Sequence, residues 1–282
     1  MLTRVAIITG SSSGLGLSTT IQLARQGFEV LATMRNKDKF TVFNLHTNEQ
    51  DVLDRILPYQ LDVTDQESIN RFSEKVNTLE RVDVLINNAG FAIGGFAEQV
   101  EINDYRRQFE TNLFGVMAIT QAVLPKMRQK RNGTIINISS VSGRMGFPGI
   151  SAYVSSKYAL EGYSESLRLE LRPFGIQVAI VEPGSFQTNI WSSGMEISKG
   201  SLNDQSPYHD YMTKIISSLE SSKKNHQDPI LVANLVAKIA NMKEIKRLRY
   251  PVGKGLKATL FLKQIIPWKW WERIVLKIIF KK

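Results

Sequence analysis

A short apolar run, a turn and an amphipathic helix recur in that order along residues 4–181, and this repeat constrains the fold more than any other feature. We expect strands over residues 5–8, 29–33, 59–61, 83–87, 134–138 and 177–181, and helices over 14–26, 65–79, 103–129 and 151–172. Strands that read as continuous apolar runs and alternate with helices are typical of a parallel sheet covered on both faces. The sequence therefore predicts a single doubly wound α/β domain.

Composition excludes several kinds of site. The chain has 282 residues and no cysteine, so disulfides, thiol catalysis and cysteine-ligated metals are excluded. Its three histidines, His46, His209 and His226, are too scattered to predict a metal site. The apolar run at residues 5–8 is shorter than the seven or so residues of a secretory signal, and no stretch reaches the roughly eighteen apolar residues of a spanning helix. We expect a cytoplasmic protein without a metal ion.

The first predicted strand runs into Thr-Gly-Ser-Ser-Ser-Gly-Leu-Gly at residues 9–16, which opens a helix. Gly10 allows a tight turn, Gly14 lets a pyrophosphate approach the backbone, and Gly16 allows close packing of helix on strand. The helix N-terminus offers unpaired N–H groups to phosphates. The segment predicts a dinucleotide site in a Rossmann domain, with further contacts from Ser11, Ser12, Ser13 and Leu15. The alternative is a serine-rich turn that only caps the helix.

Two later positions indicate which dinucleotide binds. An NAD-selective site carries an acidic residue about 20 residues after the glycines, but here Met34 and Arg35 follow the second strand. Because an arginine can pair with a 2′-phosphate, we expect NADP(H) rather than NAD(H), the alternative being a solvated charge. Asp62, followed by Val63, is expected to accept from the adenine amino group or to precede a helix cap.

Tyr153 and Lys157 are four residues apart, so they lie on one face of the helix over 151–172. An ammonium beside a phenol favours the phenolate, which predicts a lowered pKa for Tyr153 and a role as general acid and base. The same spacing joins Tyr250 and Lys254, but a proline and a glycine between them disfavour a regular helix. We therefore set that second pair aside.

The surroundings of this pair resemble a known family. Ser140 follows a predicted strand and precedes Tyr153 by thirteen residues, Asn-Asn-Ala-Gly at 87–90 ends the preceding strand, and Asn112 lies in the helix between. These strand ends share the carboxyl edge of a parallel sheet, where ligands bind. With the loop at 9–16, Leu-Asp-Val at 61–63 and Pro-Gly at 183–184, the ordered set resembles the short-chain dehydrogenase/reductase family over about residues 3–190.

The resemblance implies a role for each position. Tyr153 is the general acid and base, and Ser140 hydrogen-bonds the reacting oxygen, with Ser139 as a rival that the thirteen-residue spacing disfavours. Lys157 holds the nicotinamide ribose and lowers the pKa of Tyr153, and Asn112 holds a water that relays protons to Lys157. The remaining cofactor contacts that it implies are Asn88, Ala89, Gly90, Pro183, Gly184 and Thr188.

Segments 32–36, 81–90 and 153–171 are most similar to the branch with 17β-hydroxysteroid and retinol dehydrogenases, which favours NADP(H) with an arginine where Arg35 stands. The resemblance implies reversible hydride transfer between NADP(H) and an alcohol/carbonyl pair, here an apolar ketone or aldehyde. It also implies a homo-oligomer, a dimer or a tetramer, formed through the helices over 103–129 and 151–172. The alternative is a catalytically idle NADP-binding sensor.

The segment 185–228 is polar and has no clear strand, so we expect a lid or binding loop. Its apolar side chains Phe186, Trp191 and Met195 are candidate walls of a substrate pocket beside Ser140. The alternative is that they pack in a small satellite core.

Residues 243–282 hold twelve Lys and Arg and two acidic residues, which accounts for the whole net charge of +10. We therefore divide the chain into a catalytic domain, residues 1–242, and a basic extension, residues 243–282. Residues 256–280 mix lysines with Leu, Ile, Phe and three tryptophans, and three interpretations are open. They form two amphipathic helices, broken near Pro267, that pack on the body or on a neighbouring subunit; they lie on a membrane, as in a membrane-surface lipid or acyl reductase; or they bind nucleic acid, which the neutral remainder of the chain disfavours.

Overall fold

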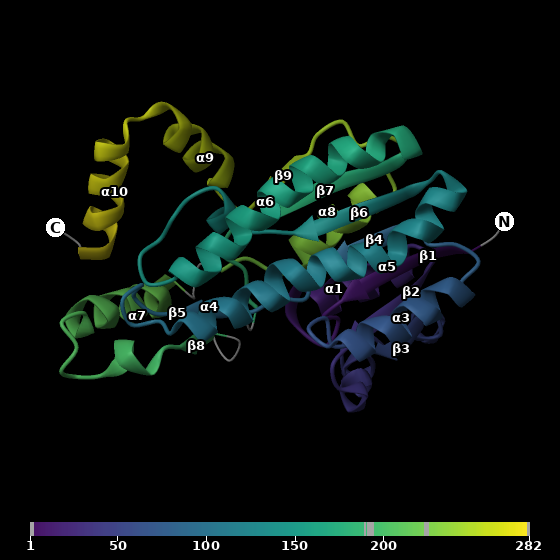
Figure 1. Ribbon diagram of the computed structural model, residues 1–282, viewed down its shortest axis with the longest axis horizontal. Helices are drawn as coiled ribbons and strands as arrows, with labels where there is room; N and C mark the ends of the chain where they lie inside the picture. Colours follow the sequence, from purple (N-terminus) through teal and green to yellow (C-terminus); the bar gives the residue numbers. More distant parts are fainter. Residues whose placement is uncertain (1–2, 189, 191–194, 223–225, 281–282) are drawn as a thin grey trace.

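The computed structural model (Figure 1) describes residues 3–188, 190, 195–222 and 226–280. Its centre is a seven-stranded parallel sheet with the strand order β3-β2-β1-β4-β6-β7-β9. The strands are β1 (Arg4–Thr9), β2 (Phe28–Met34), β3 (Ile56–Gln60), β4 (Val84–Asn87), β6 (Gly133–Ile138), β7 (Ile176–Pro183) and β9 (Arg249–Val252). The predicted doubly wound α/β fold is confirmed.

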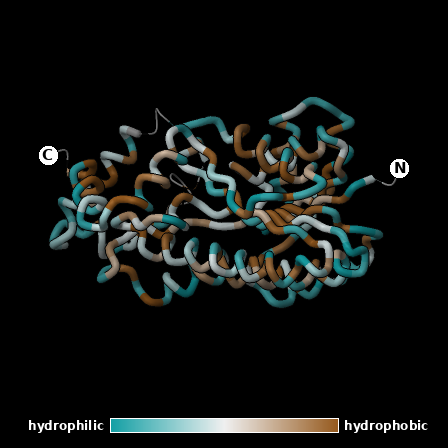
Figure 2. The backbone as a smooth tube through the Cα atoms, turned by 90° about the horizontal axis from the view of Figure 1, so that it is seen from above, coloured by the Kyte–Doolittle hydropathy of each residue, from teal (hydrophilic) through white to brown (hydrophobic). Residues whose placement is uncertain are grey.

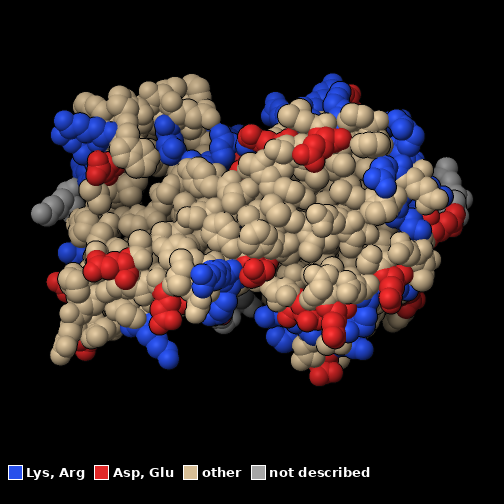
Figure 3. All heavy atoms as spheres, in the orientation of Figure 1, with Lys and Arg blue, Asp and Glu red and all other residues tan. Residues whose placement is uncertain are grey.

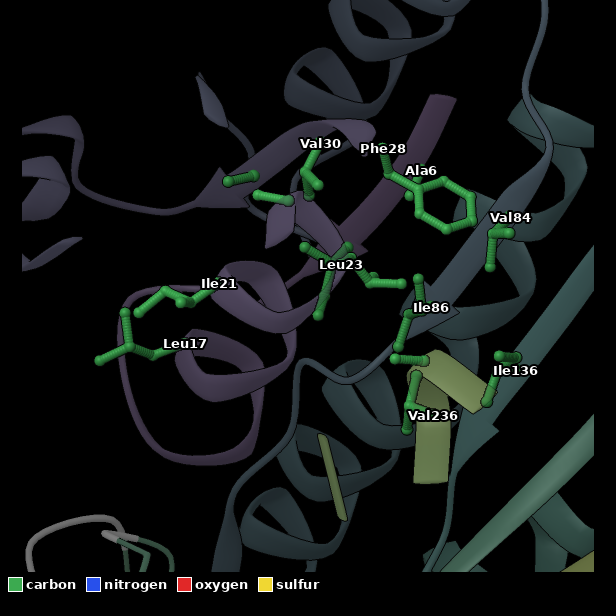
Figure 4. Close-up of a cluster of buried hydrophobic side chains, with 14 of the residues drawn as sticks. Ala6, Leu17, Ile21, Leu23, Phe28, Val30, Val84, Ile86, Ile136 and Val236 are labelled. Carbon is green, nitrogen blue, oxygen red and sulfur yellow. The ribbon is translucent and has the colours of Figure 1, made fainter. Parts of the chain in front are cut away.

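Helices cover both faces of the sheet. One face carries α1 (Gly14–Arg25) and α8 (Ile230–Ala240), and the other carries α3 (Gln66–Thr78), α5 (Gly115–Lys130) and α6 (Ser151–Leu171). Neighbouring strand residues serve opposite faces, as Ile8 and Ile7 do in β1, because successive side chains of a strand alternate. Figure 4 shows the α1 face, where Leu17 and Ile21 lie in the same cluster as Val236 of α8. Figure 2, in which the chain is coloured by residue hydropathy, shows hydrophobic residues gathered at the sheet between these layers.

Three elements differ from the expectation. Strand β9 pairs in parallel with β7, so the sheet does not end at residue 242 but takes its seventh strand from the segment assigned to the extension. Within 185–228, β8 (Met195–Ile197) forms a small second sheet with β5 (Ala92–Gly94), and α7 (His209–Ser222) follows. The single helix expected over 103–129 is divided into α4 (Ile102–Phe109), a π-helical turn (Glu110–Phe114) and α5.

A chain of buried polar side chains joins β4 and β6 to the helices on one face. The Asn87 amide donates to Thr120 Oγ1 of α5 at 3.1 Å and to Asn137 Oδ1 of β6 at 2.8 Å. The Asn137 amide donates in turn to Ser164 Oγ of α6 at 2.8 Å. We call these four residues the buried amide chain. Buried polar groups are costly unless they are paired, so this chain fixes how α6 sits on the sheet.

The chain ends in two helices, α9 (Leu256–Ile265) and α10 (Trp268–Phe280), which lie on either side of Pro267 as the sequence predicts. Both lie beyond the carboxyl edge of the sheet, and α10 approaches α7 there (Figure 1). No helix among the described residues is long and apolar enough to cross a membrane.

Candidate active site

The glycine-rich loop after β1 is closed by backbone that leaves no room for side chains. Gly10 has a φ of +69°, and a Cβ there would lie 2.9 Å from Ala89 Cα. A Cβ on Gly16 would overlap the carbonyl oxygen of Gly10. Real Cβ atoms do not approach backbone this closely, so both positions require glycine.

The segment after β4 is bonded to this loop. Thr9 Oγ1 accepts from the backbone N–H groups of Asn88 and Ala89, both at 3.0 Å. The Asn88 amide donates to the carbonyl oxygens of Thr9 and Gly10 at 2.8 and 3.0 Å. Asn88 therefore shapes the loop through its side chain, while Gly90 packs next to Asn112.

The serines of the loop have different surroundings. Ser11 is fully buried, and its hydroxyl donates to the Thr33 carbonyl of β2 at 3.0 Å. Ser13 occupies the N-cap position of α1, but its side chain makes no capping hydrogen bond. The alternative, in which the serines serve only to cap the helix, is therefore not supported. Thr188 lies over the loop, with its Cβ 3.5 Å from the point that a Cβ on Gly14 would occupy.

A second part of the site lies at the ends of β2 and β3. Arg35 is exposed there and borders a cavity of about 680 Å³ with Lys37, Tyr59, Asp62 and Arg71. The sequence did not indicate the cations Lys37 and Arg71, because only Arg35 stands at a position that the motif marks. Asp62 Oδ1 accepts from the Thr64 N–H and hydroxyl at 2.9 and 2.7 Å.

The cap of α3 comes from the next acidic residue, because Asp65 accepts from the Ser68 N–H at 2.7 Å. Asp62 thus holds the turn before that helix, as one of its two interpretations expects. Val63 is buried and packs close to Gly115 at the start of α5.

The candidate catalytic side chains meet between the end of β6 and the start of α6. Tyr153 is 3% exposed, and its phenol is hydrogen-bonded to the Ser140 side chain. Lys157 Nζ donates to the Ile138 carbonyl at 2.9 Å and lies 5.7 Å from the centroid of the Tyr153 ring. Ser139 faces the other way, toward Gly143 and Glu161. The structure therefore brings Ser140, and not Ser139, to the phenol.

The pKa of Tyr153 moves in the direction opposite to the expectation. Burial raises it to about 12, and the hydrogen bond with Ser140 only opposes that rise. Burial also lowers the pKa of the Lys157 ammonium to about 8, against the negative charge of Glu161. Spacing alone predicted a charge next to the phenol, but loss of water is the larger effect on both groups.

Asn112 lies in the π-helical turn between α4 and α5 and is 1% exposed. Its amide donates to the Phe91 carbonyl and to Ser156 Oγ, both at 3.1 Å, and its carbonyl oxygen accepts from the Phe91 N–H at 3.2 Å. Ser156 lies between Tyr153 and Lys157 in the sequence, so Asn112 holds the turn of α6 that carries these two candidate residues. π-Helical turns of this kind are frequent at functional sites.

The candidate pocket residues do not all lie together. Met195 and Ile190 pack against the small cluster that contains Tyr153, together with Phe147. Phe186, in contrast, is 2% exposed and belongs to the main core cluster on the α1 and α8 face, so its expected place in the pocket wall is corrected. Trp191 lies outside the described residues. Phe147 and Ile190 were missed because no motif marks them.

A buried ionic network reaches α6 at Glu161, four residues after Lys157. Glu182 at the end of β7 is fully buried and pairs with Arg144 at 3.0 Å. Arg249 of β9 pairs with Glu161 at 2.8 Å and with Glu182 at 3.6 Å. Burial raises the pKa of both carboxyl groups, against the pull of these arginines. No sequence motif indicated the network, because its partners come from distant segments.

The family model for the short chain dehydrogenase matches residues 4–196, which covers the loop, the strand ends and the Tyr153 helix. This chain belongs to the short-chain dehydrogenase/reductase family. It is an oxidoreductase of that family, and the resemblance stated from the motifs is confirmed. Among the described residues, no group of three His, Asp or Glu side chains is placed to hold a metal ion.

Two curated relatives of this short-chain dehydrogenase illustrate the match. An uncharacterized oxidoreductase, YusZ, from Bacillus subtilis is 47% identical and covers 98% of this chain and 99% of its own. Retinol dehydrogenase 8 from Bos taurus is 39% identical over 66% of this chain and 60% of its own.

Two solved structures share the fold. A short-chain dehydrogenase from Streptomyces avermitilis superposes with a TM-score of 0.80 at 31% identity, covering 94% of this chain and 93% of its own. ElxO with NADP bound has a TM-score of 0.74 at 26% identity and covers 91% of this chain and 100% of its own.

Proposed function

We propose that this oxidoreductase transfers hydride reversibly between NADP(H) and an apolar ketone or aldehyde and its alcohol. The observation that carries the proposal is the buried Tyr153 phenol, hydrogen-bonded to Ser140 and with Lys157 one helical turn away. The three groups lie at the same sheet edge as the glycine loop, so a dinucleotide held there reaches them.

The residues fit a nicotinamide dinucleotide. The loop between Gly10 and Gly16 is a cradle that side chains would fill, and the first turn of α1 points uncapped N–H groups toward it. Thr188 and Gly90 border the same edge. When bound, NADPH supplies a hydride from its nicotinamide ring.

The chain's own residues then handle the proton. Tyr153 donates its phenolic proton to the substrate oxygen, and its pKa of about 12 keeps that proton in place at neutral pH. Ser140 hydrogen-bonds the same oxygen. Lys157 stabilises the phenolate that remains and holds the nicotinamide ribose, and Asn112 holds a water that returns a proton through Lys157.

Arg35 supports NADP(H) over NAD(H), together with its neighbour Lys37 at the mouth of the same cavity. Both cations line this cavity together with Asp62, so a 2′-phosphate bound there would meet two positive charges, and we assign Asp62 as the adenine contact. ElxO, a structural relative, carries NADP. Arg35→Asp should weaken NADPH binding at least tenfold and narrow the preference over NADH, whereas Lys39→Asp, an exposed cation four residues on, should not. Unchanged NADPH affinity in Arg35→Asp would refute this assignment.

The apolar character of the substrate rests on the side chains around Tyr153. Met195, Phe147 and Ile190 are partly buried and pack on the cluster that holds the tyrosine. They offer apolar surface next to the Ser140 and Tyr153 hydroxyls, which suits a carbonyl on a hydrocarbon body. We also propose that the enzyme is a homo-oligomer.

The test is NADPH oxidation at 340 nm with a panel of ketones, aldehydes, ketosteroids, retinal and quinones, with NADH in parallel. Tyr153→Phe should lose about 100- to 10,000-fold in turnover and keep its NADPH affinity. Tyr158→Phe is the matched control, because Tyr158 lies on the same helix but is 43% exposed. Full turnover in Tyr153→Phe would refute the mechanism, and tight NADPH binding without turnover of any carbonyl would favour the idle sensor.

A further inference from the structure

The last two helices form a structure that the catalytic machinery does not use. We call residues 256–280, which comprise α9, the turn at Pro267 and α10, the C-terminal arm. Its inner side is anchored, because Leu256, Leu260 and Trp271 are 6–8% exposed and cluster with Met145. The arm therefore has one side that packs on the body and one side that does not.

The outer side of α9 is apolar. Phe261, Leu262 and Ile265 are 64%, 43% and 61% exposed. Because residues three and four apart lie next to each other on a helix surface, these side chains form a continuous stripe. A stripe with this spacing is what a surface helix normally buries against a core. Here the buried stripe is the other one, at Leu256 and Leu260.

The outer side of α10 continues this surface. Trp270, Ile274 and Ile278 recur at every fourth residue and are 60%, 37% and 64% exposed, and Trp268 at the start of the helix is 64% exposed. The inward stripe runs beside them through Trp271. The arm thus exposes two tryptophans and several large aliphatic side chains next to one another. On the surface of most soluble proteins, such residues are scattered singly.

The charges of the arm surround this apolar surface. Residues 256–280 contain five basic side chains and one acidic residue, Glu272. None of these cations forms an ion pair with a carboxylate in the part of the chain that the structure describes. Lys263 and Arg273 instead lie 5.7 and 5.9 Å from the ring centroids of Trp268 and Trp270. In Figure 3 this end of the molecule is mostly tan, with Lys and Arg at its edges and an acidic patch beside them.

This combination fits one kind of partner. Aromatic and aliphatic side chains flanked by cations are what an interfacial helix presents to anionic headgroups and the acyl boundary below them. A nucleic acid would use the cations but leave the isoleucines and leucines in water. A second copy of the arm would bring five like charges against five. At 13 residues, α10 is about 20 Å long, which is too short to span a hydrocarbon core of about 30 Å.

We propose that the C-terminal arm docks the enzyme on anionic lipid bilayers, with Trp268, Trp270 and the exposed aliphatic residues of both helices in the interface. The arm reaches the catalytic region through Phe147, which packs against both the arm's inner cluster and the cluster around Tyr153. Docking therefore brings the substrate side of the site to the membrane. The consequence that carbonyl compounds dissolved in the bilayer are substrates rests on the proposed function, but the docking itself does not.

The test is flotation of the full chain with vesicles of phosphatidylcholine containing 30 mol% phosphatidylglycerol, against pure phosphatidylcholine. The wild type should float with the anionic vesicles, and binding should fall at least tenfold in Trp270→Ser/Ile278→Ser. Leu45→Ser/Leu231→Ser is the matched control, because it removes two exposed apolar side chains outside the arm, 82% and 46% exposed, and should bind as the wild type does. Lys269→Gln/Lys277→Gln should bind the anionic vesicles more weakly than the wild type does at low salt, and the difference between the two should shrink as salt is raised.

Equal flotation of the wild type and Trp270→Ser/Ile278→Ser, or no flotation of the wild type, would overturn the proposal. So would a change from oligomer to monomer in that variant, measured by light scattering, without a loss of lipid binding, since a second copy would then cover the face. NADPH binding is measured on the same samples without vesicles. A protein that binds NADPH but not lipid loses only the docking proposal, and one that binds lipid but neither NADPH nor any carbonyl loses only the proposed function.

Discussion

Replacing Lys157 with methionine should make the folded protein more stable at neutral pH. Lys157 is 5% exposed, and burial lowers the pKa of its ammonium from 10.5 to about 8. At about 1.4 kcal/mol for each pKa unit, the buried charge costs the folded state about 3 kcal/mol below pH 8. Methionine has a similar length and no charge, so Lys157→Met removes this cost.

The substitution also removes a hydrogen bond. Lys157 Nζ donates to the Ile138 carbonyl at 2.9 Å, and the loss of one such bond costs about 1 kcal/mol. The net gain is then about 2 kcal/mol in the free energy of unfolding, which for a chain of this size raises Tm by about 3 °C.

The effect of Lys157 on the free energy of unfolding depends on pH. Because the pKa is lower in the folded state, the unfolded chain binds more protons between pH 8 and 10.5, and the wild type becomes more stable as pH rises through that range. The advantage of Lys157→Met should therefore be full at pH 7, shrink above pH 8, and vanish or reverse near pH 10.5.

The assay is equilibrium unfolding in urea, followed by circular dichroism at pH 7.0 to 10.5 in steps. Lys126→Met is the control, because Lys126 donates to the Asn77 carbonyl at 3.0 Å from an exposed position, and it should lose a little stability at every pH. A Lys157→Met protein that is less stable than the wild type at pH 7, or whose difference from it does not change with pH, would refute the reasoning.

Three further outcomes are expected. The absorbance difference at 295 nm between the wild type and Tyr153→Phe should stay flat up to pH 10, because burial raises the pKa of Tyr153 to about 12; a step below pH 9 would contradict it. Gly16→Ala should lower NADPH affinity at least 100-fold, since its Cβ overlaps the Gly10 carbonyl, whereas Gly162→Ala, with nothing within 4 Å of its Cβ, should bind normally and be about 0.5–1 kcal/mol more stable. Trp271→Ala removes the buried anchor of the C-terminal arm at a cost of about 3 kcal/mol, so limited proteolysis should cut the arm at lower protease concentration; an unchanged digestion pattern would show that Trp271 is not an anchor.

The central strands were predictable because burial on both faces leaves a plain signature. Ile135 and Ile136 of β6 are both fully buried, one on each face, and a strand of this kind reads as an unbroken apolar run. Strand β9 gives no such signal. It is a half-buried edge strand, Arg-Tyr-Pro-Val, whose proline lowers its strand propensity. Pairing with β7 and ion pairs from Arg249 place it in the sheet, and neither is visible in local sequence.

The site was predictable to the extent that it depends on fixed spacing. The thirteen residues from Ser140 to Tyr153 and the four to Lys157 mark groups that the structure brings together. The direction of the Tyr153 pKa was not predictable, because desolvation depends on what covers the helix. Phe186 shows the same limit, since only the fold reveals that its ring belongs to the main core and not to the loop around it.

The buried amide chain has a consequence for the catalytic helix. Ser164 of α6, which accepts from Asn137, lies about 16 Å along the axis from Tyr153. A helix turns by 100° for each residue, so a slip of one position would replace the phenol with a neighbouring alanine or valine and take the Ser164 hydroxyl away from the Asn137 amide that donates to it. The direction in which the Tyr153 side chain points thus depends on the Asn137 amide, which binds α6 three turns away from Tyr153. Substitutions at Asn87, Asn137 or Ser164 would then act on turnover at a distance, and these positions are free to change only in concert.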